Sequence, residues 1–116
     1  MVASKENQYI KAINASSSDV ISLNNANATN LKTSLTPKEI IKKLGAKVIS
    51  KQRLENENLE IFYCFVENVS NFVVENGKKI NLQIANNGEF SIVGFPLILT
   101  GYWLFLMYKT FYCGNN

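Results

Sequence analysis

Between Thr36 and Leu59 the chain changes from the pattern of a helix to the pattern of β-strands, and this change limits the fold more than any other feature. Thr36, Pro37 and Glu39 form a helix start signal, with a capping threonine, a proline in the first position and a glutamate that completes a capping box. Gly45 supplies the left-handed conformation that ends a helix. Between these signals apolar residues recur at helical spacing, at Pro37, Ile40, Ile41 and Leu44. The segment 35–45 is therefore predicted to be an amphipathic helix.

After Gly45 the helical spacing of apolar residues gives way to the two-residue period of strands, most clearly over 59–66. We predict strands over 46–54, 59–66, 72–75, 79–85 and 90–99, the last with a kink at Gly94 and Pro96. The strand at 59–66 is apolar on one face and partly apolar on the other, which favours a central position in the sheet. The predicted fold class is α+β, with an antiparallel sheet of four or five strands packed against one or two helices.

The turns between these strands carry their own signals. Asn76 and Gly77 supply the positive φ angles of a type I′ turn, which predicts a hairpin between 72–75 and 79–85. A polar turn is predicted at 55–58 and a second Asn-Gly-containing turn at 86–89. Within the hairpin, Asn81 and Gln83 are predicted to face solvent, opposite the inward-facing Ile80, Leu82 and Ile84.

The first third of the chain is rich in Asn, Ser and Ala. Tyr9, Ile10 and Ile13 fall at helical spacing and predict a short helix over 5–15, and a short strand is predicted over 19–23 with loop after it. We therefore divide the chain into a weakly ordered N-terminal segment 1–34, an α+β domain 35–102 and an apolar aromatic tail 103–116.

The residue types argue against catalysis. The chain has no histidine, which removes the commonest general base and metal ligand. Cys64 and Cys113 have no metal-binding or redox spacing, so they form one disulfide or none, and Cys64 is predicted to be a core residue. Glu55, Glu57 and Glu60 lie in or beside a polar turn without the pattern of a calcium loop. We predict no catalytic, metal or cofactor site.

The charge is modest, with 12 basic and 9 acidic residues and a net charge of +3. Lys38 and Lys42 on the predicted helix are either a solvated face or a docking face. Two further pairs have the charge to contact phosphate, namely Lys51 with Arg53 and Lys78 with Lys79, but no glycine-rich loop opens a helix beside them. A dense basic face is absent from the pattern, so nucleic acid is not a predicted partner.

The segment 91–108 contains no charged residue, and 18 residues are just long enough to span a bilayer as a helix. Against this interpretation stand its glycines and proline, and the fit of its first part as the last strand of the sheet. Its aromatic residues suit a membrane interface or a protein partner. The candidate interaction residues here are Tyr102, Trp103, Phe105 and Tyr108.

Three segments and one tyrosine carry a family resemblance: LTPKEIIKKLGA at 35–46, NGKKINLQIA at 76–85, IVGFPLI at 92–98, and Tyr102. Together they resemble the YwmB family of low-GC Gram-positive bacteria. The resemblance implies a TATA-box-binding-protein-like fold, with a curved antiparallel sheet backed by helices, in an exported protein without an established activity. It does not imply DNA binding. The start of the chain, residues 1–4, fits either the end of a signal peptide or an ordinary initiator methionine.

These observations lead to one main functional expectation and two alternatives. The main expectation is a non-catalytic interaction or structural domain that is exported to the cell envelope and contacts an unknown protein or envelope partner. The first alternative is a tail-anchored membrane protein, with membrane contact through 91–108. The second is a weak nucleic-acid binder, suggested by the implied fold and the lysines of the helix.

Overall fold

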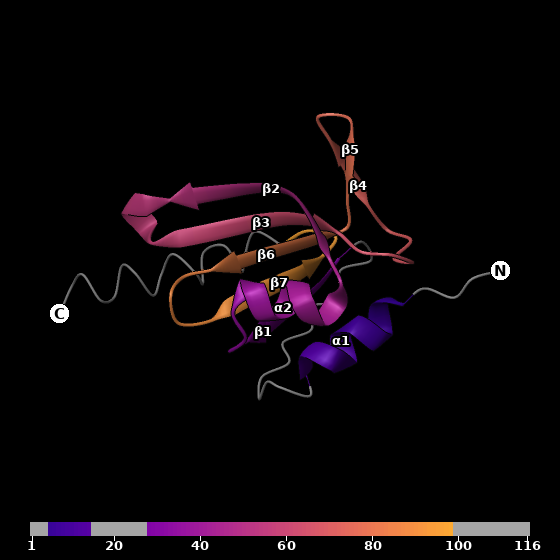
Figure 1. Ribbon diagram of the computed structural model, residues 1–116, viewed down its shortest axis with the longest axis horizontal. Coiled ribbons are helices and arrows are strands. Elements are labelled where there is room, and N and C mark those ends of the chain that lie inside the picture. Colours follow the sequence, from indigo (N-terminus) through magenta and orange to yellow (C-terminus); the bar gives the residue numbers. More distant parts are fainter. Residues whose placement is uncertain (1–4, 15–27, 99–116) are drawn as a thin grey trace.

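The computed structural model describes residues 5–14 and 28–98, which form two helices, a five-stranded antiparallel sheet and a two-stranded hairpin (Figure 1). The helices are α1 (Glu6–Asn14) and α2 (Pro37–Leu44), with a single 3-10 turn, η1 (Glu55–Glu57). The large sheet contains β1 (Thr29–Thr33), β2 (Lys47–Leu54), β3 (Leu59–Phe65), β6 (Leu82–Asn86) and β7 (Ser91–Phe95), and the hairpin contains β4 (Val73–Glu75) and β5 (Lys78–Ile80). The predicted α+β class is confirmed.

The strands of the large sheet lie in the order β1-β7-β6-β3-β2, and each strand is antiparallel to its neighbours. β3 has a strand on each side, in agreement with its apolar sequence. β1 corrects the prediction, because the sequence predicts a loop there. Its five residues pair with β7 from Thr29 opposite Phe95 to Thr33 opposite Ser91. Leu31 is its single large apolar residue, so the alternation that marks a strand is too weak to detect. The strand predicted at 19–23 lies outside the described residues.

Helix α2 begins and ends as predicted. The Thr36 side chain accepts a hydrogen bond from the Glu39 amide at 3.2 Å, and the Glu39 carboxylate accepts one from the Thr36 amide at 3.0 Å. Gly45 ends the helix with φ 63°. The prediction of a helix at 5–15 is also confirmed, by α1. The apolar side of α1 faces the core at Ile13, which is fully buried.

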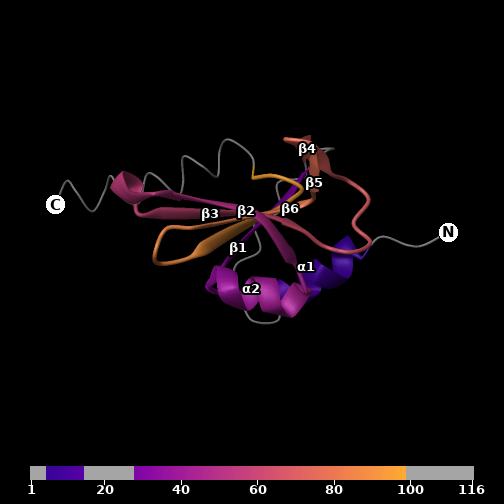
Figure 2. The same ribbon diagram turned by 45° about the horizontal axis from the view of Figure 1, so that its top comes forward.

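Both helices cover one face of the sheet, here called the helix face (Figure 2). Ile13 of α1 and Ile40 of α2 pack there against strand side chains that include Ile84 and Val93. Cys64 of β3 is fully buried in the same layer, which confirms its prediction as a core residue. Burial of apolar side chains of this size contributes about 1.5–3 kcal/mol each and accounts for the cohesion of helices and sheet.

The opposite face of the sheet, here called the second face, is also apolar. Its buried side chains are Leu59, Ile61, Ala85, Ile92 and Ile98. After β7 the chain turns back across this face, where the Gln83 side chain accepts a hydrogen bond from the Ile98 amide at 2.7 Å. The Asn30 side chain donates to the Leu97 carbonyl at 3.0 Å. The prediction that Gln83 faces solvent is therefore wrong: it is 4% exposed, because the returning chain covers it.

The hairpin β4–β5 forms around Asn76 and Gly77 as predicted, and both residues have positive φ, 50° and 76°. It projects from the large sheet as a separate unit (Figure 1). The predicted strand 79–85 is split at Asn81 into β5 and β6. Asn81 was expected at the surface but is fully buried, because its amide bonds to the backbone of Val66 and Val69. The chain bends there instead of continuing as one strand.

The predicted boundaries of the α+β domain lie at residues 35 and 102. The strand β1 lies before the predicted boundary at residue 35, yet it belongs to the same sheet as β7. Within the uncharged run 91–108, the first five residues form β7, which agrees with the prediction of a last strand and leaves no helix starting at Ser91. Residues 99–108 and the tail 103–116 lie outside the described residues.

Candidate binding site at the free edge of the sheet

The strand β2 is an edge strand of the large sheet. Its inner side pairs with β3, and within residues 5–14 and 28–98 no strand lies on its outer side. Six of its eight residues are exposed, whereas β1 at the other edge is largely buried. An edge strand presents backbone N–H and C=O groups that a further strand can pair with. β2 is therefore the accessible pairing edge of the described fold.

A β-bulge interrupts β2 near its start. The register with β3 shifts between Val48 and Ser50, so that Ile49 is the extra residue. From Ser50 to Leu54 the pairing is regular. Val48 is 41% exposed, so part of its apolar side chain is accessible to a partner. A bulge bends a strand and redirects its side chains, so the start of β2 departs from the regular ladder.

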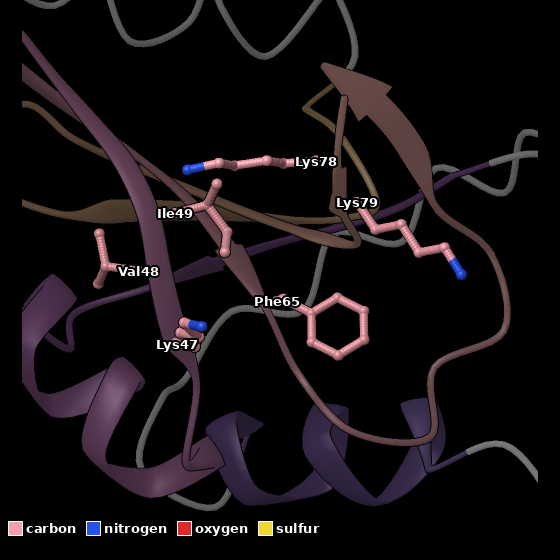
Figure 3. A pocket seen from close by; sticks show the side chains of 6 residues that line it. All are labelled: Lys47, Val48, Ile49, Phe65, Lys78 and Lys79. Atoms are coloured by element: carbon pink, nitrogen blue, oxygen red, sulfur yellow. The ribbon is translucent and has the colours of Figure 1, made fainter. Parts of the chain in front are cut away.

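An open groove of about 440 Å³ lies between the start of β2 and the hairpin β4–β5 (Figure 3). Figure 3 shows Lys78 extending from the hairpin toward β2 and Phe65 lying between the strand and the hairpin. Lys47 and Phe65 are partners in the β2–β3 ladder and so share a face of the sheet. The residues that line the groove are Lys47, Val48, Ile49, Phe65, Lys78 and Lys79.

The groove is positively charged, because its lining holds three lysines and no carboxylate. Lys78 stands opposite Glu75 in the hairpin ladder, but no ion pair joins them, and Lys47 likewise makes none with a described residue. Lys79 lies over the Phe72 ring, 4.7 Å from its centroid. The ammonium groups of Lys47 and Lys78 can bind an anionic ligand, while that of Lys79 points away from β2 (Figure 3). The hydrocarbon of the lining offers an apolar contact.

Farther along β2 the basic side chains are partly neutralised. The Glu60 carboxylate is 3.3 Å from the Lys51 ammonium and 3.4 Å from the Arg53 guanidinium. Both basic side chains are about half exposed, so each pair contributes little to stability. Because one carboxylate faces two cations, this part of the edge keeps an excess of positive charge.

Two of the residues singled out from the sequence, Lys38 and Lys42, do not line this groove. Lys38 and Lys42 are exposed on α2. Lys38 lines a second groove of about 620 Å³ beside β2 and β3, where the ion-paired Glu60 and Lys51 are also found. Lys78 and Lys79, considered from the sequence as phosphate contacts, do line the main groove. Tyr102, Trp103, Phe105 and Tyr108 lie outside the described residues.

Burial limits the chemistry of Cys64. Cys64 is a free thiol, and desolvation in the core raises its pKa to about 12, which keeps it protonated and unreactive at neutral pH.

In the chain segments that the structure describes, no three metal-binding side chains gather into a group, and neither helix has the length and apolar character needed to cross a membrane.

Sequence reasoning missed Lys47, Val48, Ile49 and Phe65. β2 and β3 were both predicted as strands, but the groove depends on which strand is at the edge and on where the hairpin projects. One signal was present: β2 carries three basic residues and little apolar alternation, which is typical of an exposed edge strand.

Comparison with known proteins returns no match: neither a family model, nor a curated protein, nor a solved structure matches the chain. The resemblance to the YwmB family therefore stays a prediction.

Proposed function

We propose that this protein is a non-catalytic binding domain that takes an anionic partner in the groove beside the β2 edge. The observation that carries the proposal is the groove lining, which combines three lysines with Val48, Ile49 and Phe65 and contains no carboxylate. Such a lining supplies attraction and apolar contact. It contains no acid–base pair and no activated nucleophile of the kind that catalysis uses.

The proposal is tested by titrating the full chain with poly-L-glutamate at low salt and following backbone amide shifts by NMR. We expect the largest shifts at 47–49, at Phe65 and at 78–79, and we expect them to disappear as salt is added because exposed charges are screened. The double charge reversal of Lys47→Glu with Lys78→Glu removes the response. Shifts centred on Lys38 and Lys42 of α2, or no shifts at all, contradict the proposal.

We also propose that the domain works in the cell envelope, as the family resemblance implies. The test is fractionation of the native host, followed by carbonate extraction and N-terminal sequencing of the recovered protein. A soluble or wall-associated exported protein beginning near residue 4 is the expected result. Recovery only in the cytosol contradicts the envelope location, and recovery only in detergent favours a membrane anchor instead.

A further inference from the structure

We infer that the anionic partner is an extended acidic polypeptide segment that adds to the sheet as a further strand along β2, with one end in the groove. This inference rests on the proposed function, because it assigns a chemistry and a backbone geometry to the same site. It goes beyond attraction between charges, since it requires backbone hydrogen bonds to β2.

The free edge provides the backbone partner. β2 contains eight residues, and a strand of that length extends over roughly 26 Å at about 3.3 Å per residue. Its regular part runs from Ser50 to Leu54, with its inner groups paired to β3. Addition of a strand to such an edge is a common mode of peptide recognition, in which the main chain gives affinity and side-chain pockets give specificity.

The charges along β2 select an acidic strand. Successive side chains of a strand point to opposite faces, so Lys51 and Arg53 lie on the face of Phe62 and Glu60, while Lys47 lies on the face of Phe65. The helix face of the regular ladder is therefore basic, whereas the second face carries one basic residue, Lys47, before the bulge. A strand laid beside it places alternate side chains on each face, so acidic residues on the helix face meet Lys51 and Arg53, and one placed beyond the bulge meets Lys47.

The same charges argue against a second copy of this chain as the partner. Pairing β2 with another β2 would set lysines and arginine of one edge beside those of the other, and like charges on neighbouring strands are destabilising. Basic residues and a bulge protect edge strands from self-association for this reason. Pairing of β2 with a second β2 is therefore disfavoured, whereas pairing with an acidic strand is favoured.

The groove adds specificity at one end of the strand. The bulge ends the regular ladder at Ser50, and beyond it Lys47 and Lys78 border the groove, while the exposed Val48 lies across β2 from Lys78 (Figure 3). The partner therefore needs about five residues in extended form for the ladder. Next to them it needs an acidic residue for the lysines and an apolar residue that contacts Val48, Ile49 or Phe65.

Nucleic acid is the competing anionic partner, and the geometry favours peptide over it. A nucleic acid offers no backbone N–H groups that could extend the β2 ladder. A nucleic-acid surface is expected to be more densely basic than this edge.

The test compares three fluorescent peptides of eight residues by anisotropy with the full chain at low salt. The first alternates glutamate with threonine or valine and has one phenylalanine next to its end. The second has the same sequence with N-methyl groups at alternate amides, which removes backbone donors without changing the charge. The third replaces each glutamate with lysine. We expect the first to bind, the second to bind at least about ten-fold more weakly, and the third not to bind.

Protein variants locate the site. The charge reversal Lys47→Glu with Lys78→Glu should weaken the first peptide at least about ten-fold, whereas Lys38→Glu with Lys42→Glu changes the net charge equally at exposed lysines of α2 and should have a much smaller effect. Hydrogen exchange of the β2 amides should slow when the peptide is bound. Circular dichroism checks that all variants are folded.

Four other outcomes would each contradict a specific part of the inference or of the proposed function. Equal binding of the N-methylated peptide leaves anionic binding intact but overturns strand addition. Stronger binding of a single-stranded oligonucleotide, with displacement of the peptide, assigns the site to nucleic acid and overturns the inference. Loss of binding in the α2 variant alone moves the site away from β2. Failure of both poly-L-glutamate and the acidic peptide to bind overturns the proposed function as well.

Discussion

Asn81 has a disproportionate effect on the fold for a single side chain. Its carboxamide accepts a hydrogen bond from the Val66 amide at 2.8 Å and donates to the carbonyls of Val66 and Val69 at 2.9 and 3.3 Å. These contacts hold the end of β3 against the bend between β5 and β6. They also explain why a polar residue in a predicted surface position is buried.

Replacing Asn81 with alanine should lower the free energy of unfolding by about 2–4 kcal/mol, because buried backbone groups lose their partners. Urea denaturation followed by circular dichroism measures the change. The exposed Asn56→Ala is the matched control and should change stability by less than about 0.5 kcal/mol. Equal stability of the two variants would show that water replaces the Asn81 contacts without loss.

Cys64 provides a second prediction at the level of one residue. Because burial raises its pKa to about 12 and leaves it fully inaccessible, the thiol should not react with DTNB at pH 8 in the folded protein. It should react completely in guanidinium chloride. A Cys113→Ser background isolates the signal of Cys64, and rapid labelling of the folded protein in this background contradicts the burial of β3 on the helix face.

Helix α2 depends on its capping box, which is a property of one element. Thr36→Ala removes the acceptor of the Glu39 amide and should lower the free energy of unfolding by about 1 kcal/mol. Thr36→Ser keeps the hydroxyl and serves as the control. Thermal or urea unfolding measures both variants, and an unchanged stability of Thr36→Ala would mean that tertiary packing alone fixes the start of α2.

The same capping box gives α2 a dependence on pH. The hydrogen bond from the Thr36 amide holds the pKa of Glu39 below its ordinary value, so ionised Glu39 stabilises the folded state above the unfolded pKa, and this contribution is lost as pH falls through the folded pKa. Glu39→Gln should therefore be less stable than the natural chain at pH 7. The difference should disappear in acid, and a difference that persists unchanged at pH 2 contradicts the role of the charge. Urea titrations across this pH range provide the measurement.

At the scale of the whole molecule, the return of the chain across the second face joins strands that are distant in sequence. Residues 97 and 98 bond to Asn30 of β1 and Gln83 of β6, and a Cβ atom at Gly94 would overlap the backbone of Leu97. Gly94→Ala should therefore displace this segment and lower the free energy of unfolding by about 1–3 kcal/mol.

Hydrogen exchange at the Ile98 amide, measured together with urea unfolding, reports on that displacement. Gly77→Ala is a useful comparison, because nothing lies within 4 Å of the added Cβ and its cost comes from the positive φ of 76° alone. It should leave exchange at Ile98 unchanged. Fast exchange in both variants would show that the segment opens independently of Gly94.

Local signals in the sequence predict most of the elements but not their arrangement. The capping box and Gly45 define α2, and the Asn76-Gly77 turn defines the hairpin, because each depends on the conformations of a few consecutive residues. β1 escapes prediction since its sequence lacks alternation, and only pairing with β7 makes it a strand. Asn81 and Gln83 are placed wrongly because their partners lie 12 to 15 residues away.

For the candidate site too, the local properties can be predicted from the sequence, but the assembly of the groove cannot. The sequence by itself determined that the chain forms an α+β structure, that the β2 segment is basic, and that Lys78 and Lys79 flank a tight turn, because these properties are local. Only the tertiary structure decided that β2 is an exposed edge, that a bulge interrupts it near its start, and that Lys47, Phe65 and Lys78 share one groove. Strand order results from burying two apolar sheet faces at once, and no window of consecutive residues contains that information.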